Sequence, residues 1–214
     1  MKNIELIIFD LDGTLIDSKL DLANAVNHSL QTLGLPGIEN EKVYGFIGDG
    51  LWKLIERSLG AGNADKLENA VRLFREYYGR HLLDNTKLYP GVENTLARFK
   101  GKKKAVVTNK PEGFSRDILE GLKILEHFNL VYGGDTFNRH KPDPHCLLCA
   151  MRELGAEVSR VVMVGDGRND ILAAKAASIA SCAVGYGLEN KQQLMSAGPD
   201  FYIENISQLA GIIE

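Results

Sequence analysis

The sequence predicts an α/β fold, in which a doubly wound parallel sheet carries an inserted all-helical subdomain. Short apolar runs alternate with amphipathic helical patterns along most of the chain, which is typical of a Rossmann-like sheet with helices on both faces. One block interrupts this alternation, because residues 18–87 contain helical patterns and no strand run. We therefore expect a core of residues 1–17 and 88–214 and a helical subdomain of residues 18–87.

The expected strands are short runs of apolar residues. The strongest runs are IELIIF (4–9), AVVT (105–108) and VVMVG (161–165), and weaker ones cover 130–132, 180–184 and 201–203. Helical patterns lie between them, punctuated by proline near their starts and glycine past their ends. The apolar residues of these helices are Val92, Leu96 and Phe99; Phe114, Ile118, Leu122 and Leu125; and Leu147, Leu148, Met151 and Leu154.

The inserted block shows three helical faces. They are formed by Leu22, Val26, Leu30 and Leu33; by Leu51, Leu54, Ile55 and Leu59; and by Leu67, Val71, Phe74, Tyr78 and Leu82. A segment of this size is too large for a crossover between strands and too regular for a loop. We therefore expect it to fold as a small helical subdomain.

The composition is that of an ordinary globular protein. The chain has 214 residues, of which 44% are hydrophobic and 25% are charged, and its formal net charge is -3. This balance gives no reason to expect nucleic acid or an acidic membrane as a partner. No apolar run is long enough to span a bilayer, and the N-terminus MKNIELIIFD lacks a signal-peptide cleavage site. The expected location is the cytoplasm.

Acidic and polar residues follow each of the three strongest strands. They are Asp10, Asp12, Gly13 and Thr14 after the first strand, Thr108, Asn109 and Lys110 after the second, and Asp166, Gly167, Asn169 and Asp170 after the third. Lys141 lies in the loop HKPDP, which precedes the third strand. Because ligands bind beyond the carboxyl ends of the strands in an open parallel sheet, these side chains are expected to converge on one edge.

The converging acids predict a magnesium site. Mg²⁺ prefers oxygen ligands and is usually held by a few carboxylates, water and a substrate phosphate. Asp10 and Asp166 are expected to supply carboxylate oxygens. A bound cation would offset the repulsion between Asp10 and Asp12, which is costly at the end of a core strand. Asp170 is expected to support these ligands or to cap a helix.

The same residues suit phosphoryl transfer. Asp10 is ionised at neutral pH and is able to attack phosphorus as a nucleophile. Asp12 could give a proton to the leaving oxygen and then take one from the attacking water. Lys141 and Thr108 would neutralise and hydrogen-bond the phosphoryl oxygens, and Gly13 would allow the backbone to approach the anion.

Cys146 and Cys149 form a C-x-x-C motif with several interpretations. The motif suits a redox pair at a helix start, or half of a zinc site whose second half the sequence lacks. The interpretation that we favour is two small apolar residues on one buried helix face.

The motif GDGRND half-matches a dinucleotide-binding loop. Asp170 occupies the place of the third glycine, and Asp166 would repel a pyrophosphate. A nucleotide cofactor is therefore not expected.

Four motifs together resemble those of the haloacid dehalogenase superfamily. They are DLDGT at Asp10–Thr14, Thr108 in VVTNK, Lys141 in KPDP, and GDGRND at Gly165–Asp170. The helical block resembles the inserted cap of that superfamily. Within it, the chain is similar to the bacterial phosphoglycolate phosphatases in stretches such as GFIGDG, LYPGVENTLA and VYGGDTF.

This resemblance implies a magnesium-dependent phosphomonoester hydrolase that works through an aspartyl-phosphate intermediate. It implies that Asp10 is the nucleophile and that Asp12 is the general acid/base, with its backbone carbonyl on the magnesium. Asp166 would complete the metal site, with Asp170 in support. The residues expected around the phosphate are Gly13, Thr108, Asn109 and Lys141.

The resemblance also narrows the substrate to a small phosphorylated metabolite, with 2-phosphoglycolate expected first. Asp12 argues for phosphoryl transfer, because dehalogenating relatives lack this second aspartate. The alternatives are a phosphomutase of the β-phosphoglucomutase type, a pyrophosphatase and a nucleotide phosphatase. A binding protein without activity is a further alternative, but the intact acids argue against it. The loop GFIGDG is expected either to lean over the site or to form a helix-capping turn. Either a monomer or a homodimer is compatible with the sequence.

Overall fold

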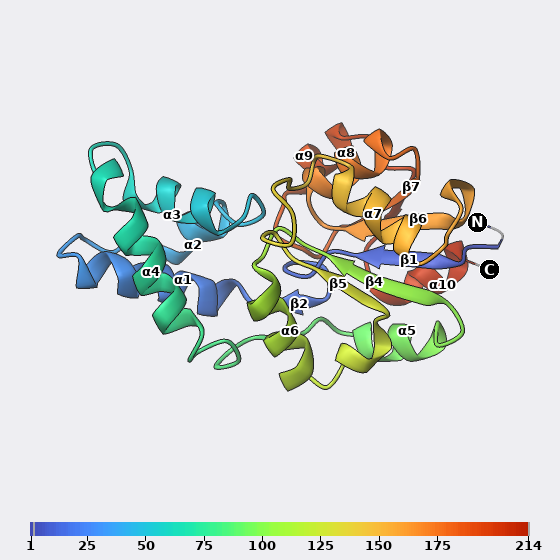
Figure 1. Ribbon diagram of the computed structural model, residues 1–214, viewed down its shortest axis with the longest axis horizontal. Helices are drawn as coiled ribbons and strands as arrows, with labels where there is room; N and C mark the ends of the chain where they lie inside the picture. Colours follow the sequence, from blue (N-terminus) through green and yellow to red (C-terminus); the bar gives the residue numbers. More distant parts are fainter. Residues whose placement is uncertain (2, 214) are drawn as a thin grey trace.

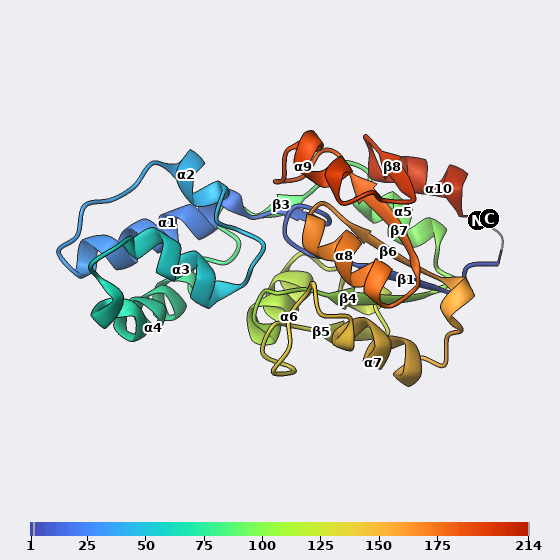
Figure 2. The same ribbon diagram turned by 90° about the horizontal axis from the view of Figure 1, so that it is seen from above.

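The computed structural model describes residue 1 and residues 3–213, which form two parts that lie side by side (Figure 1). One part is a layered α/β structure that carries both ends of the chain. The other is a group of four helices, α1 to α4, at the opposite end of the molecule (Figures 1 and 2). The two parts meet at the carboxyl ends of the strands (Figure 1).

The sheet has six strands in the order β5-β4-β1-β6-β7-β8, and every neighbouring pair is parallel. The strands are β1 (Leu6–Phe9), β4 (Lys103–Val107), β5 (Leu130–Tyr132), β6 (Val161–Gly165), β7 (Ala180–Val184) and β8 (Phe201–Ile203). The predicted α/β class is confirmed, and the three weaker apolar runs are strands as well. Since β1 is flanked by β4 and β6, the residues that follow it leave from the middle of the sheet.

Helices cover both faces of the sheet (Figures 1 and 2). One face packs against α5 (Val92–Arg98), α6 (Glu112–Gly121) and α10 (Leu209–Ile212), and the other against α7 (His145–Glu153), α8 (Arg168–Ala176) and α9 (Lys191–Ser196). Short 3-10 turns lie at η1 (Ala64–Lys66), η2 (Leu125–His127), η3 (Val158–Arg160) and η4 (Ile206–Gln208). Ile7 and Phe9 of β1 join the first core, and Leu6 and Ile8 join the second. Burial on both faces explains why β1 is continuously apolar.

The helical group comprises α1 (Lys19–Thr32), α2 (Asn40–Tyr44), α3 (Leu51–Leu59) and α4 (Leu67–Tyr78). Its three long helices follow the predicted apolar faces, whereas α2 was not predicted. The third face was expected to reach Leu82, but α4 ends at Tyr78. Gly79 follows, with its N–H bonded to the Arg75 carbonyl, and the chain then turns through residues 80–85. A glycine at this position favours the end of a helix.

The chain passes between the two parts through two paired segments. β2 (Ile16–Asp17) and β3 (Lys87–Leu88) form a short antiparallel pair that the sequence did not predict. Beside them, the buried Asp21 carboxylate accepts hydrogen bonds of 2.7–2.9 Å from the backbone and side chains of Asn85 and Thr86. Four donors satisfy this buried acid, so that the two crossings are held together.

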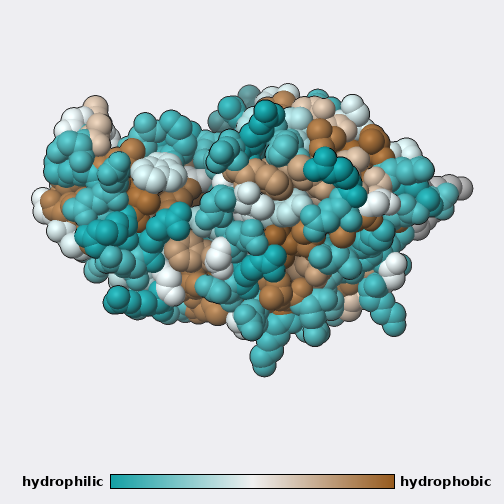
Figure 3. Space-filling view, in the orientation of Figure 1, coloured by the Kyte–Doolittle hydropathy of each residue, from teal (hydrophilic) through white to brown (hydrophobic). Residues whose placement is uncertain are grey.

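On the face shown in Figure 3, the surface of both parts is mostly polar, with smaller apolar areas between the polar side chains. The Trp52 side chain on α3 is exposed. Across the part of the chain that the structure describes, every helix is too short or too polar to cross a membrane.

Candidate active site

A tight loop follows β1 and carries the two N-terminal acids. The Asp10 N–H donates to the Val164 carbonyl of β6 at 2.9 Å, which extends the sheet by one residue. Gly13 then adopts a φ of +82°, and a Cβ there would lie 2.1 Å from Oδ2 of Asp166. Glycine is therefore needed at position 13, both because φ is positive and because the loop passes close to Asp166, which follows β6.

Three carboxylates meet where β1 and β6 end. Oxygens of Asp10, Asp166 and Asp170 lie within 4.8 Å of one another. The Lys141 ammonium group lies between two of them, 2.9 Å from Oδ1 of Asp10 and 2.6 Å from Oδ1 of Asp170. Lys141, Asp166 and Asp170 are each at most 4% exposed. Residues from three distant segments are thus brought together as the strand order predicts.

The acidic cluster is under electrostatic strain. Burial raises the pKa of Asp166 well above its usual range, and the charges of Asp10 and Asp170 raise it further. Burial and Asp10 likewise raise the pKa of Asp170, against the opposing effect of Lys141. Burial alone would lower the pKa of Lys141, but Asp10 and Asp170 outweigh it and raise that pKa. The single ammonium group of Lys141 cannot balance the three carboxylates, so the site has room for further positive charge.

The cluster fits a hard divalent cation. Although Lys141 is close to Oδ1 of Asp10, the contact is an ion pair without hydrogen-bond geometry, and this oxygen is buried with no hydrogen-bond partner. This carboxylate oxygen is paired with the Lys141 ammonium group and lies beside two further acids, which is the oxygen-rich environment that Mg²⁺ binds. The Asp12 carboxylate does not belong to this group and points toward Lys110 instead.

Asp166 and Asp170 are held in place by their own hydrogen bonds. Asp166 accepts from the Thr14 hydroxyl at 2.9 Å and from the Leu188 N–H at 2.8 Å. Asp170 accepts from the Gly167 N–H at 3.0 Å, at the start of α8. Each carboxylate therefore has one orientation, as a preformed metal site requires.

Thr108 and Asn109 follow β4 and are both buried at the same edge. The Asn109 amide donates to the Lys141 carbonyl at 3.0 Å and to the Gly48 carbonyl at 2.9 Å, and its oxygen accepts from the Lys141 N–H at 3.0 Å. We expected Asn109 around the phosphate. In this structure its side chain orients the Lys141 backbone and holds the turn at Gly48.

Asp12 lies in a second network, which sequence reasoning did not identify. Its carboxylate accepts from the Ser18 hydroxyl at 2.5 Å and from the Lys110 ammonium group at 3.1 Å. Lys110 also donates to the Tyr78 hydroxyl at 2.7 Å. The motif VVTNK contains Lys110, but its partner Tyr78 comes from α4, and no local pattern links the two.

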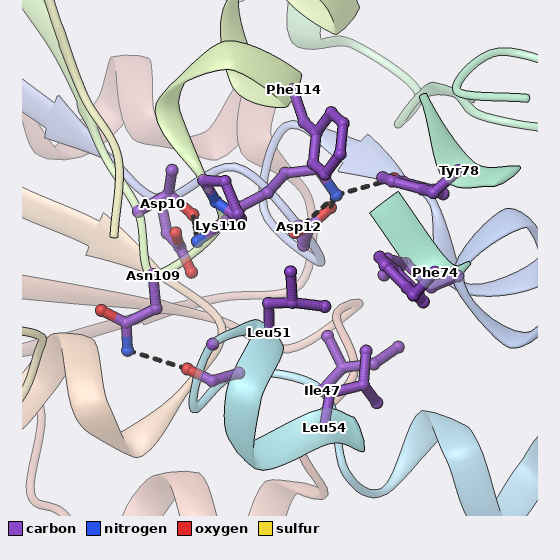
Figure 4. Close-up of a pocket in the computed structure, with 15 residues that line it drawn as sticks. Asp10, Asp12, Ile47, Leu51, Leu54, Phe74, Tyr78, Asn109, Lys110 and Phe114 are labelled. Atoms are coloured by element: carbon purple, nitrogen blue, oxygen red, sulfur yellow. Dashed lines mark hydrogen bonds and ion pairs between the residues drawn. The ribbon is translucent and has the colours of Figure 1, made fainter. Parts of the chain in front are cut away.

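A cavity lies between the acids of the core and the helical group (Figure 4). Its empty volume, which includes open solvent, is about 490 Å³. Asp10, Asp12 and Lys110 face it from the core, and Leu51, Leu54 and Phe74 face it from α3 and α4; it is also lined by Leu22, Ile47, Gly48, Gly50, Tyr78, Thr108, Asn109, Pro111 and Phe114. The loop GFIGDG forms a turn that reaches the core. There the Gly48 carbonyl accepts a hydrogen bond from Asn109, and the Asp49 carboxylate accepts one from Asn169.

The three cysteines are buried and free. Cys146 and Cys149 lie on α7 in the core that covers one face of the sheet. Cys146 contacts the Arg139 carbonyl at 3.3 Å, and Cys149 contacts His145 at 3.6 Å.

Comparison with known proteins agrees with this geometry. Residues 7–184 match the haloacid dehalogenase-like hydrolase family. The chain is 37% identical to a phosphoglycolate phosphatase of Chromobacterium violaceum, over 100% of this chain and 98% of that protein. It is 40% identical to phosphoglycolate phosphatase 1 of Pseudomonas aeruginosa, over 95% and 78%. A crystal structure of a predicted phosphoglycolate phosphatase from Haemophilus somnus superposes with a TM-score of 0.92 at 31% identity, over 99% of both chains.

The chain therefore belongs to the haloacid dehalogenase-like hydrolases. Its relatives place it among the phosphatases of this family, so that it is an enzyme of the phosphatase class. Members of this class generally use a metal ion, and the cluster of Asp10, Asp166 and Asp170 is a group of described residues that could hold one.

Proposed function

We propose that this protein is a magnesium-dependent phosphomonoesterase that hydrolyses 2-phosphoglycolate to glycolate and phosphate. One observation carries the proposal. A buried carboxylate oxygen of Asp10 has no hydrogen-bond partner and lies beside two further acids and a buried lysine. The two oxygens of this carboxylate could serve a metal and a phosphorus atom, and the names of the relatives point to phosphoglycolate as the ester.

In the proposed reaction each of the two N-terminal acids has one role. A carboxylate oxygen of Asp10 bonds to phosphorus while the bond from phosphorus to the ester oxygen breaks, and Asp12 transfers its proton to that leaving oxygen. Water then attacks the phosphorus of the aspartyl-phosphate and gives a proton to Asp12, and Asp10 leaves as a carboxylate. Both acids finish the cycle as they began it.

The phosphoryl group needs positive charge and hydrogen-bond donors. Lys141 is the ammonium group beside Asp10, and the Thr108 hydroxyl lies at the same edge. Asn109 fixes the backbone of Lys141, and Gly13 keeps the loop close enough for its amides to approach the anion. In this proposal Lys141 and Thr108 hold the transferring group in place.

Mg²⁺ would be held by the carboxylates of Asp10 and Asp166 and by the backbone carbonyl of Asp12, with Asp170 in support. When bound, the ion supplies positive charge that offsets the three acids and the phosphoryl oxygens. Asp10, Asp166 and Asp170 are already clustered, so binding would require little rearrangement of these side chains.

We further propose that residues 18–87 act as a cap on a core of residues 1–17 and 88–214. Helices α3 and α4 face the acids across the cavity, and the turn at Gly48 bonds to Asn109 of the core. A cap in this position would exclude bulk water and large esters while the aspartyl-phosphate exists.

A substrate panel tests the proposal. The purified protein is incubated with Mg²⁺ and 2-phosphoglycolate, hexose phosphates, a nucleoside monophosphate or pyrophosphate, and released phosphate is measured. We expect the highest kcat/KM for 2-phosphoglycolate. If hexose phosphates are preferred by far, the substrate is wrong, whereas isomer exchange without released phosphate would identify a phosphomutase.

A further inference from the structure

Lys110 is a buried cation for which the proposed reaction has no role. It is 6% exposed and lies on the wall of the cavity. Among the described residues that line this cavity, it is the one basic side chain. Burying an ammonium group is costly unless anionic or polar partners compensate it, so its position calls for an explanation.

Anionic and polar groups compensate the buried Lys110 ammonium group. The ammonium group lies 3.1 and 3.2 Å from the two carboxylate oxygens of Asp12 and 4.7 Å from the centre of the Tyr78 ring. An anion that enters the cavity therefore meets a fixed positive charge.

Tyr78 adds a hydrogen-bond donor beside this charge (Figure 4). Burial raises the pKa of Tyr78 to about 12, so the side chain is a neutral phenol. Its oxygen accepts from Lys110, which leaves the hydroxyl proton for another acceptor. The hydrogen bonds found within residues 1 and 3–213 include none that this hydroxyl donates.

The position of Asp12 fixes where the leaving group must lie. In the proposed reaction the ester oxygen receives its proton from Asp12, and Lys110 lies against the same carboxylate. In 2-phosphoglycolate a single methylene separates the ester oxygen from the carboxylate. A carboxylate so close to the ester oxygen is within reach of Lys110 and Tyr78 when the ester oxygen is at Asp12.

We propose that Lys110 and Tyr78 bind the carboxylate of the leaving group and select phosphate esters that carry an acid next to the ester carbon. The assignment rests on the proposed function. The facing side chains Leu51, Leu54 and Phe74 offer no competing donors, and their apolar surroundings strengthen a contact between charges. Arg57, near the turn at Gly48, is already paired with Asp49 and lines an adjoining cavity that Asp10 and Asp12 also border.

The test compares two esters that differ in the acid. Ethyl phosphate replaces the carboxylate of 2-phosphoglycolate with a methyl group, and kcat/KM is measured for both with Mg²⁺. Lys110→Met removes the charge and keeps the stem, and we expect the ratio of the two kcat/KM values to fall by about 100-fold. Tyr78→Phe removes only the hydroxyl and should lower the ratio by about 10-fold.

Lys104→Met is the matched control. Lys104 is another buried lysine, 3% exposed, but its ammonium group donates to the Phe99 and Lys102 carbonyls, far from the cavity lining. Its substitution should leave the substrate ratio unchanged. Thermal unfolding of each variant shows whether it is folded at the assay temperature.

The outcomes separate this inference from the proposed function. If the wild type prefers 2-phosphoglycolate and Lys110→Met slows both esters equally, Lys110 serves Asp12 alone and the inference is wrong, while the proposed function stands. If the wild type does not prefer 2-phosphoglycolate to ethyl phosphate, both the substrate and the inference are wrong.

A second measurement covers a Lys110 variant that does not fold. Phosphonoacetate and ethylphosphonate, which differ in the same carboxylate, are compared as inhibitors of the wild-type enzyme. We expect the inhibition constant of phosphonoacetate to be lower by about 30-fold or more. Equal constants would overturn the assignment.

Discussion

The two walls of the cavity are built in opposite ways. On the core side, Asp10 and Asp12 line the cavity, and each is paired with a buried lysine, Lys141 or Lys110. On the helical side, the wall consists of apolar side chains such as Leu54 and Phe74. A charged network tolerates little change in geometry, whereas an apolar wall can be repacked at modest cost. We expect the core to set the reaction, and the apolar helical wall to limit which esters fit beside Lys110.

Substitution at the nucleophile should have the largest effect. Asp10→Asn keeps the shape of the side chain but removes the attacking carboxylate, and we expect kcat to fall by at least ~10⁴-fold. Phosphate release under saturating ester measures it. Asp17→Asn, at a partly exposed acid paired with Lys19 outside the cluster, is the control that should retain activity. A tenfold loss or less in Asp10→Asn would contradict the assignment.

Removal of the metal should have the next largest effect. Chelation with EDTA leaves three buried acids facing one lysine, and we expect activity to fall by roughly 10²–10⁴-fold and to return with Mg²⁺. Mg²⁺ at about 100 times its dissociation constant should also stabilise the folded protein by about 2.7 kcal/mol, measured by thermal unfolding. Full activity in EDTA would show that the acids act without an ion.

A methyl group at Gly13 should disturb the metal site more mildly. In Gly13→Ala the new Cβ would meet Oδ2 of Asp166 at a residue with a φ of +82°. We expect the concentration of Mg²⁺ needed for half-maximal activity to rise by about 10–100-fold. Gly113→Ala, in α6 with open space around its Cα, should leave this concentration unchanged. An unaltered Mg²⁺ requirement in Gly13→Ala would separate the loop from the metal site.

The helical wall should give the smallest effect on catalysis. Leu54→Ala enlarges the cavity, and we expect KM to rise by less than about 10-fold with little change in kcat. Leu59→Ala removes a buried leucine of the same helix that does not line the cavity, and it should leave KM unaltered. Both variants should lose about 2–5 kcal/mol of stability in denaturant unfolding. A large fall in kcat for Leu54→Ala would break the division of roles between the two walls.

The sequence was most informative about the core side. Val161–Gly165 and the other buried strands are continuous apolar runs, and the topology of a parallel sheet places Asp10 near Asp166 once those strands are recognised. The helical side was harder to predict. Lys110 and Tyr78 meet only because the two parts are docked in one orientation, and such a contact leaves no local periodicity to detect.

Turn chemistry accounts for smaller differences. The pairing of β2 with β3 spans only two residues of each strand, which is too short for an alternating pattern. The end of α4 at Tyr78 depends on the glycine that follows, and the apolar Leu82 beyond it suggested a longer helix. That Asn109 lies near the phosphate stays a prediction, and its hydrogen bonds to Lys141 and Gly48 depend on loops whose shape the sequence does not specify.

The chain leaves the sheet layer and re-enters it at neighbouring points. There Asp17 pairs with Lys87, and Asp21 accepts hydrogen bonds from Asn85 and Thr86. A segment such as residues 18–87, whose two ends lie side by side, can be replaced without displacing the strands of the sheet. If the helical group is the cap that we propose, replacing it would change the choice of ester and leave the residues of the core in place.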